Sequence, residues 1–273
     1  MRYHFKTDQG IECLTAQEAA KLAGENPDSH QMDLHEAIHR REFPSWTLRV
    51  QIMPAAAAKG YRLHPFDVTK VWPHADYPLR EVGKLTLDRN PANYFADVEQ
   101  AAFDAANFVL GIGLSPDKML QGRLFAYGDA HGYRLGVNHT QLPVNGPHAA
   151  AAANYGRDGF MRFDVNSGDA RIYEPNNCDG PAQTDAPLYA PLETSGGSGS
   201  YAWDSREGDD FEQAGALYRV MDEAARARLV SSIAGSLAQV SKDEIVARSV
   251  AHFRAADPEY GERVATALAA LRM

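Results

Sequence analysis

Two arginines and one tyrosine in the middle of the chain have a spacing that suits a metal-ligand site. The stretch from Ser115 to Arg134 begins Ser-Pro-Asp, which predicts a helix with the serine as its N-cap. On that helix Arg123 and Tyr127 share a face one turn apart, and Arg134 returns near the same face. Adjacent positive charge favours the phenolate form of a tyrosine. A phenolate is a hard anion suited to ferric iron, although most tyrosines beside an arginine make a simple surface or core contact.

Strands are predicted on the amino-terminal side of this helix. Residues 1–8 and 45–53 alternate apolar with polar side chains, as strands with one buried face do. Residues 80–89 are predicted as another strand, with Val82, Leu85 and Leu87 as its apolar side chains. In residues 45–53, Trp46, Leu48, Val50 and Ile52 alternate with Thr47, Arg49 and Gln51, which predicts a strand with one clearly buried face. Strands in series, interrupted by helices, indicate an α+β chain with an antiparallel sheet.

Helical patterns interrupt the strands and return at the end of the chain. Thr15 and Glu18 form a capping box at the start of one inserted helix, and Ser29 is the predicted N-cap of a second. A long stretch rich in Pro, Gly, Asn and Asp lacks periodicity, so we expect it to wrap over the protein body or a neighbouring subunit. The chain therefore divides into a sheet with two inserted helices (1–110), the tyrosine-bearing helix (111–134), a wrapping segment or linker (135–212) and a helical domain (213–273).

The bulk composition is that of an ordinary soluble protein. The 273 residues are 44% hydrophobic and 23% charged, and the net charge of -9 argues against a nucleic-acid or anionic-membrane partner. No apolar run reaches membrane-spanning length and no signal peptide is recognisable, so we expect a cytoplasmic protein. Cys13 and Cys178 have no metal-type spacing and are interpreted as reduced thiols.

The string from Arg123 to His131, Arg-Leu-Phe-Ala-Tyr-Gly-Asp-Ala-His, resembles the haem-ligand signature of monofunctional haem catalases. Further segments resemble that family in the same order. They begin at Trp46 (Trp-Thr-Leu-Arg-Val-Gln-Ile-Met-Pro), Lys70 (Lys-Val-Trp-Pro-His), Asp88 (Asp-Arg-Asn-Pro-Ala-Asn-Tyr-Phe) and Asp257 (Asp-Pro-Glu-Tyr-Gly). Within the signature, Ala130 and Gly132 depart from the threonine and larger polar residue more usual in the family, which affects hydrogen bonding near the ligand.

The resemblance implies a fold and a set of site residues. The fold would be the second half of a catalase-type antiparallel β-barrel with helical insertions, a long wrapping segment and a carboxy-terminal helical unit. The chain would then correspond to the carboxy-terminal part of the family chain and lack its amino-terminal half. The implied haem b site consists of Tyr127 as the axial iron ligand, Arg123 bonded to its phenolate, Asp117 supporting Arg123, Arg134 on a propionate, and Phe103, Met119 and His131 around the haem.

The implied activity is that of a peroxide oxidoreductase, active against oxidative stress, which converts hydrogen peroxide to water and dioxygen. The family also uses a distal histidine and asparagine, and none of the ten histidines here lies in that distal signature. We therefore expect this chain to be inactive alone or to require a complementing amino-terminal half. The resemblance also implies a homo-oligomer, since full-length family members are usually tetramers. A non-enzymatic haem-binding or truncated remnant, and a helical interaction module without haem, are the alternatives.

A second cofactor is implied by a few residues near the sheet. Lys6, Val71, Trp72 and His74 match part of the site at which some family members bind NADPH. Simple packing at a strand end explains Trp72 and His74 equally well, so both interpretations stay open.

Overall fold

The computed structural model describes residues 1–58, 60–109, 111–146, 171, 173, 175–178 and 209–272. The described residues of Met1–Asn90 and Ser200–Met273 form one compact unit, and those of Pro91–Gly199 form a second. None of the helices in these ranges combines the length and apolar character needed to cross a membrane.

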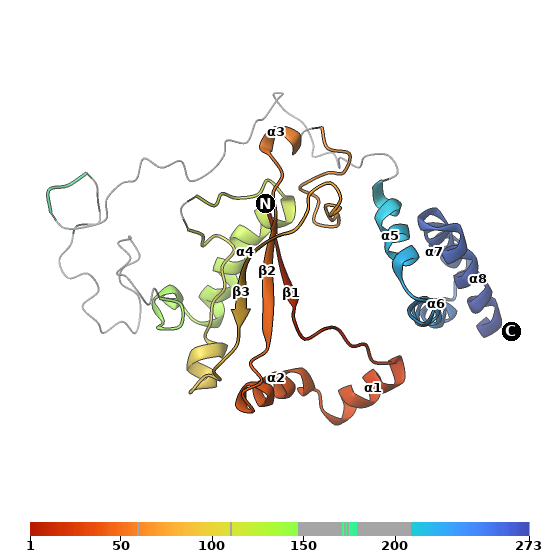
Figure 1. Cartoon of the computed structure of the whole chain (residues 1–273), viewed down its shortest axis with the longest axis horizontal. Coiled ribbons are helices and arrows are strands. Elements are labelled where there is room, and N and C mark those ends of the chain that lie inside the picture. The colour runs from red at the N-terminus through yellow and green to blue at the C-terminus, as the bar shows by residue number, and fades with distance from the viewer. Residues whose placement is uncertain are drawn as a thin grey trace. The chain divides into compact units, whose positions relative to one another are not determined.

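Three antiparallel strands form the sheet of the first unit (Figure 1). β2 (Ser45–Gln51) lies in the centre, β1 (Arg2–Thr7) on one side and β3 (Arg80–Thr86) on the other. Apolar side chains of both outer strands are exposed, including Phe5 at 56% and Val82 at 57%. Within the described ranges the sheet stays open, so it does not by itself form a barrel.

The expectation that the apolar set forms the one buried face of residues 45–53 is wrong in part. The polar Gln51 is 0% exposed and Thr47 is 9% exposed, whereas the apolar Ile52, which directly follows β2, is 43% exposed. Both polar side chains are buried because each finds a partner: the Gln51 amide donates to the Trp72 carbonyl at 3.0 Å, and the Thr47 hydroxyl donates to Asp8 at 2.7 Å. Burying a polar side chain is costly only when its hydrogen bonds to water are not replaced. The alternation pattern cannot show which polar side chains find such partners.

Asp8 connects all three strands at one end of the sheet. Its carboxylate accepts hydrogen bonds from the hydroxyls of Thr47 and Ser45, and it pairs with the Lys84 ammonium of β3 at 3.2 Å. The hydroxyl of Thr47, followed by that of Ser45, lowers the pKa of Asp8 from 3.8 to about 2.

The inserted helices follow their sequence signals closely. α1 (Ala16–Glu25) begins with the predicted capping box, in which the Thr15 amide donates to Glu18 at 2.8 Å and the Glu18 amide donates back at 3.3 Å. In α2 (Ser29–His39) the predicted N-cap is displaced by one residue, because Asp28 occupies that position without a side-chain bond. α3 (Ala55–Ala58) is a single short turn.

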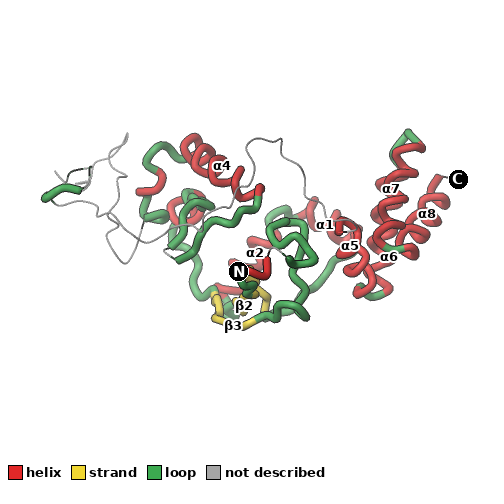
Figure 2. Tube along the Cα trace, turned by 90° about the horizontal axis from the view of Figure 1, so that it is seen from above, coloured by secondary structure: helices red, strands yellow, loops and turns green. Residues whose placement is uncertain are grey.

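Four helices at the end of the chain pack against one another (Figures 1 and 2). They are α5 (Asp209–Val220), α6 (Glu223–Ala238), α7 (Asp243–Ala256) and α8 (Pro258–Arg272). Their core consists of Tyr218, Val230, Ala234, Val246, Val250, Tyr260, Val264 and Leu268. Tyr218 and Tyr260 stack with their ring centroids 4.4 Å apart at 8°, and the Arg226 guanidinium lies 5.0 Å from the Tyr218 ring.

Two glycines bring the backbones of these helices into close contact. A Cβ on Gly261 of α8 would lie 2.6 Å from the backbone nitrogen of Arg254 in α7. A Cβ on Gly215 of α5 would lie 2.9 Å from the carbonyl carbon of Ala256. Each position therefore accepts only glycine without a shift of the helices.

The first turns of α5 attach this helical part to the segment before β3. The Gln213 side chain accepts from the Val71 amide at 2.9 Å and donates to the Val71 carbonyl at 2.8 Å. Beside it, Asp210 pairs with the buried Lys70 at 3.4 Å. The helix thus begins earlier than the predicted boundary at residue 213, and its first turns make the contact.

Candidate functional site

The helix that carries the candidate ligand is α4 (Lys118–Arg134), in the second unit. Its N-cap is Asp117 and not Ser115 as predicted, because the two carboxylate oxygens accept from the amides of Met119 at 3.0 Å and Leu120 at 3.1 Å. One carboxylate satisfies two free amides, whereas a serine hydroxyl commonly satisfies one. Asp117 thus fixes the first turn of α4, and through the position of the helix it can support Arg123.

Arg123 and Tyr127 lie together on one face of α4, as their spacing predicts. The Arg123 Nη2 donates to the Tyr127 hydroxyl at 3.0 Å, and the guanidinium carbon lies 4.9 Å from the ring centroid. Both side chains are half-buried. Because a guanidinium keeps its charge throughout the accessible pH range, the bond presents a permanent positive charge to the phenol.

Two further rings enclose the phenol of Tyr127. The Phe103 ring meets it edge-on at 5.9 Å and 77°, and the His131 ring meets it at 6.0 Å and 56°. His131 is 8% exposed, whereas Phe103 is 69% and Met119 is 60% exposed. An apolar surface thus lies open beside a partly covered phenol.

Arg134 reaches the same neighbourhood through His131. Its guanidinium donates to the carbonyls of Glu99 at 2.6 Å and Ala101 at 2.7 Å, and its Nη2 lies 3.2 Å from the Nδ1 of His131. α4 continues through its internal glycines to Arg134, which keeps these residues on one helix. Arg134 contacts His131, and the His131 ring in turn lies beside the Tyr127 ring. The sequence alone does not show these contacts.

Asn145 belongs to this network, and the sequence reasoning missed it. Its side chain accepts from the Ala102 amide at 2.7 Å and donates to the carbonyls of Gln100 at 3.0 Å and His139 at 2.9 Å. A single asparagine in a Gly- and Pro-rich stretch carries no local signal for such long-range bonds.

The residues that match the NADPH signature lie in the first unit. Lys6, Val71 and His74 are exposed, whereas Trp72 is 5% exposed. The Trp72 indole donates to the Pro65 carbonyl at 3.3 Å. Burial and this bond support packing as the role of Trp72, and NADPH binding stays a prediction.

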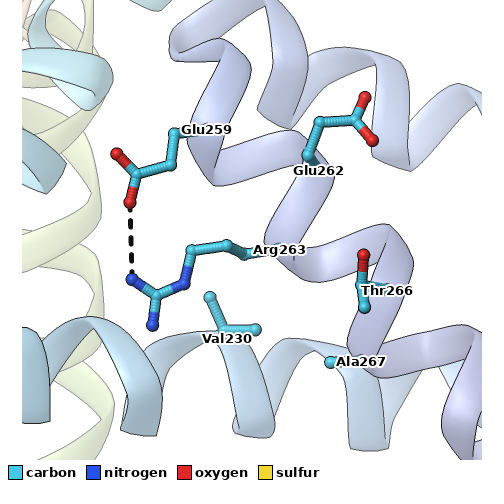
Figure 3. Close-up of a pocket in the computed structure, with 6 residues that line it drawn as sticks. All are labelled: Val230, Glu259, Glu262, Arg263, Thr266 and Ala267. Carbon is cyan, nitrogen blue, oxygen red and sulfur yellow. Dashed lines mark hydrogen bonds and ion pairs between the residues drawn. The ribbon is translucent and has the colours of Figure 1, made fainter.

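A shallow, open pocket of about 380 Å³ lies on the helical part of the chain (Figure 3). Val230 of α6 and residues of α8 line it, and Arg263 is turned towards Glu259, with which it pairs at 3.5 Å. Arg263 also pairs with Glu223 at 2.6 Å, so its charge is already compensated. Glu262 points away from this pair in Figure 3, and the pocket lacks the converging polar groups of a binding site.

Comparison with known proteins gives family matches across both parts of the chain. Residues 1–180 match the family model described as "Catalase", and residues 203–268 match the one described as "Catalase-related immune-responsive". A protein named "Catalase" from Streptomyces coelicolor is 64% identical over 275 residues, which covers 100% of this chain and 56% of the relative. A "Bromoperoxidase-catalase" from Streptomyces venezuelae is 58% identical over 273 residues, again covering 100% and 56%.

Solved structures agree with these relatives. A fungal catalase superposes with a TM-score of 0.89 at 41% identity, covering 98% of this chain and 55% of that chain. Catalase A from Saccharomyces cerevisiae has the same TM-score and identity and covers 97% and 56%. The chain therefore spans about half the length of the proteins it matches, and over that half the fold is the same.

Proposed function

The chain belongs to the catalase family, and from this premise we propose that it supplies the proximal side of a haem site for the disproportionation of hydrogen peroxide. Proteins of the family depend on haem. The observation that carries the proposal is the 3.0 Å hydrogen bond from Arg123 to the Tyr127 hydroxyl. It supports Tyr127 as the axial ligand, because it fixes the phenol oxygen and places a positive charge beside the atom that would bind ferric iron.

The surroundings of Tyr127 fit a haem. A porphyrin presents a large apolar face, and the exposed ring of Phe103 offers apolar contact beside the phenol. Met119, about two turns earlier on the same helix, is also exposed. When bound, haem supplies an iron centre that exchanges electrons with peroxide. For its part, the chain holds the phenol in place through the hydrogen bond from Arg123 and flanks it with two aromatic rings.

Arg134 is proposed to bind a haem propionate. An arginine has five N–H donors, and among the described residues three contacts are made to Glu99, Ala101 and His131. Two donors on an exposed guanidinium are enough for one carboxylate.

Disproportionation also needs an acid–base group on the peroxide side of the haem. General acid–base help is worth roughly 100- to 10,000-fold in rate. Because the sequence shows no distal histidine signature in these 273 residues, we expect them to bind haem but to release little dioxygen by themselves. We also propose that the sheet is part of a half-barrel, that the chain forms a homo-oligomer and that it is located in the cytoplasm.

Replacing Tyr127 by phenylalanine tests the ligand. Haem added to the native chain should give a high-spin ferric spectrum with a phenolate charge-transfer band, and Tyr127→Phe should abolish that band. Tyr133→Phe is the matched control, because Tyr133 lies on the same helix and is 86% exposed. A band that survives in Tyr127→Phe would refute the assignment. Rapid dioxygen release by the native chain would refute the expected dependence on a further acid–base group.

A further inference from the structure

Residues 99–103 are held by side chains from later in the chain. Each of these five residues gives a backbone group to His131, Arg134 or Asn145. The bonds join Glu99 and Ala101 to Arg134 at 2.6 and 2.7 Å, Gln100 and Ala102 to Asn145 at 3.0 and 2.7 Å, and Phe103 to His131 at 2.7 Å. A segment without regular structure at residues 100–103 thus acquires a fixed backbone.

The partners of His131 select one form of its ring. Arg134 can only donate, so the Nδ1 of His131 accepts the contact at 3.2 Å. The Nε2 then carries the hydrogen and donates it to the Phe103 carbonyl at 2.7 Å. With both nitrogens engaged and the residue 8% exposed, His131 has no lone pair left to offer a metal.

The same bond controls both neighbours of the candidate ligand. Phe103 and His131 are the two rings that flank Tyr127, at 5.9 and 6.0 Å. Since His131 bonds to the Phe103 backbone, the two rings are fixed relative to each other and hence to the phenol between them. A displaced Phe103 would leave the phenol free to tilt about the helix.

We propose that His131 is a positioning residue for Tyr127, acting through its hydrogen bond to the Phe103 carbonyl. It rests on the proposed function, because the benefit of a fixed phenol is tighter haem binding. Arg134 and Asn145 assist by fixing the rest of the segment 99–103.

Two substitutions separate the bonds of His131. His131→Gln places an amide nitrogen near the position of Nε2 and keeps the bond to Phe103. His131→Asn places an oxygen near Nδ1, keeps the contact with Arg134 and loses the bond to Phe103. We expect haem affinity within about threefold of native for His131→Gln. For His131→Asn we expect a loss of about tenfold, equivalent to about 1.4 kcal/mol or one hydrogen bond, with a shifted charge-transfer band. Equal effects of the two variants, or a larger loss in His131→Gln, would overturn the proposal.

Two measurements without haem keep the inference separate from the proposed function. Ring ¹⁵N shifts in the native chain should show a hydrogen on the Nε2 of His131, and a hydrogen on Nδ1 would overturn the proposal without any variant. The Ala102 amide should exchange at least about tenfold faster in His131→Asn than in the control Tyr133→Phe. If the native chain fails to bind haem through Tyr127, the proposed function fails while these two results still decide the role of His131.

Discussion

Gly261→Ala is expected to destabilise the helical part of the chain by about 2 kcal/mol. The added methyl would lie 2.6 Å from the backbone nitrogen and 2.7 Å from the Cα of Arg254, so α7 and α8 must separate. Overpacking typically costs about 1–3 kcal/mol, and contact with backbone atoms favours the upper end. Alanine returns about 1 kcal/mol of helix propensity, which leaves the stated net loss.

Gly235→Ala is the matched control, because it adds the same methyl to the interior of α6 with nothing within 4 Å. Here only the propensity changes, so the free energy of unfolding should rise by about 0.5–1 kcal/mol. Urea unfolding followed by far-ultraviolet circular dichroism measures both changes from the midpoints at constant slope. The two variants should therefore differ by about 3 kcal/mol. A Gly261→Ala chain as stable as Gly235→Ala would refute the close approach of α7 and α8.

Three further changes test other parts of the structure. The lowered pKa of Asp8 stabilises the folded state above about pH 4, and this stabilisation is lost as the pH falls towards about 2. In Asp8→Asn the free energy of unfolding should therefore depend less on pH between about 4 and 2, and an unchanged pH dependence would contradict this. Burial, with the bond to Asp76, raises the pKa of Tyr61 to about 12. Tyr61→Phe should therefore remove one phenol that ionises near pH 12 in an ultraviolet titration, and loss of one near pH 10 would contradict this. Gln213→Ala removes two hydrogen bonds to Val71 and should lower the free energy of unfolding by about 1 kcal/mol. The control Gln239→Ala changes an exposed glutamine and should lower it by less than about 0.5 kcal/mol, and equal losses would count against the α5 contact.

Local signals were enough for much of the fold and for the centre of the site. The capping box of Thr15 and Glu18, the alternation that gives β2, and the one-turn spacing of Arg123 and Tyr127 all depend on residues close in sequence. In each case residues close in sequence decide the local geometry, and the structure confirms the cap, the strand and the shared helix face.

Long-range partners decided what the sequence could not show. Gln51 is buried because Trp72 offers it a carbonyl, and no alternation pattern contains that information. Likewise His131 meets Phe103 only because the chain turns back between them. Asp117 and not Ser115 is the N-cap of α4. Serine and aspartate are almost equally preferred at this position, so the sequence alone could not decide between them.

The stacked rings of Tyr218 and Tyr260 provide a spectroscopic signal for the folding of the carboxy-terminal helices. Two phenol rings 4.4 Å apart and inclined by 8° couple their electronic transitions, so the folded helices should have a near-ultraviolet dichroic signal of their own. Trp46 of β2 and Trp72, which is buried beside the sheet, contribute fluorescence from a different region. Recording both signals in one unfolding experiment would reveal whether the carboxy-terminal helices and the sheet melt as one cooperative body or in sequence.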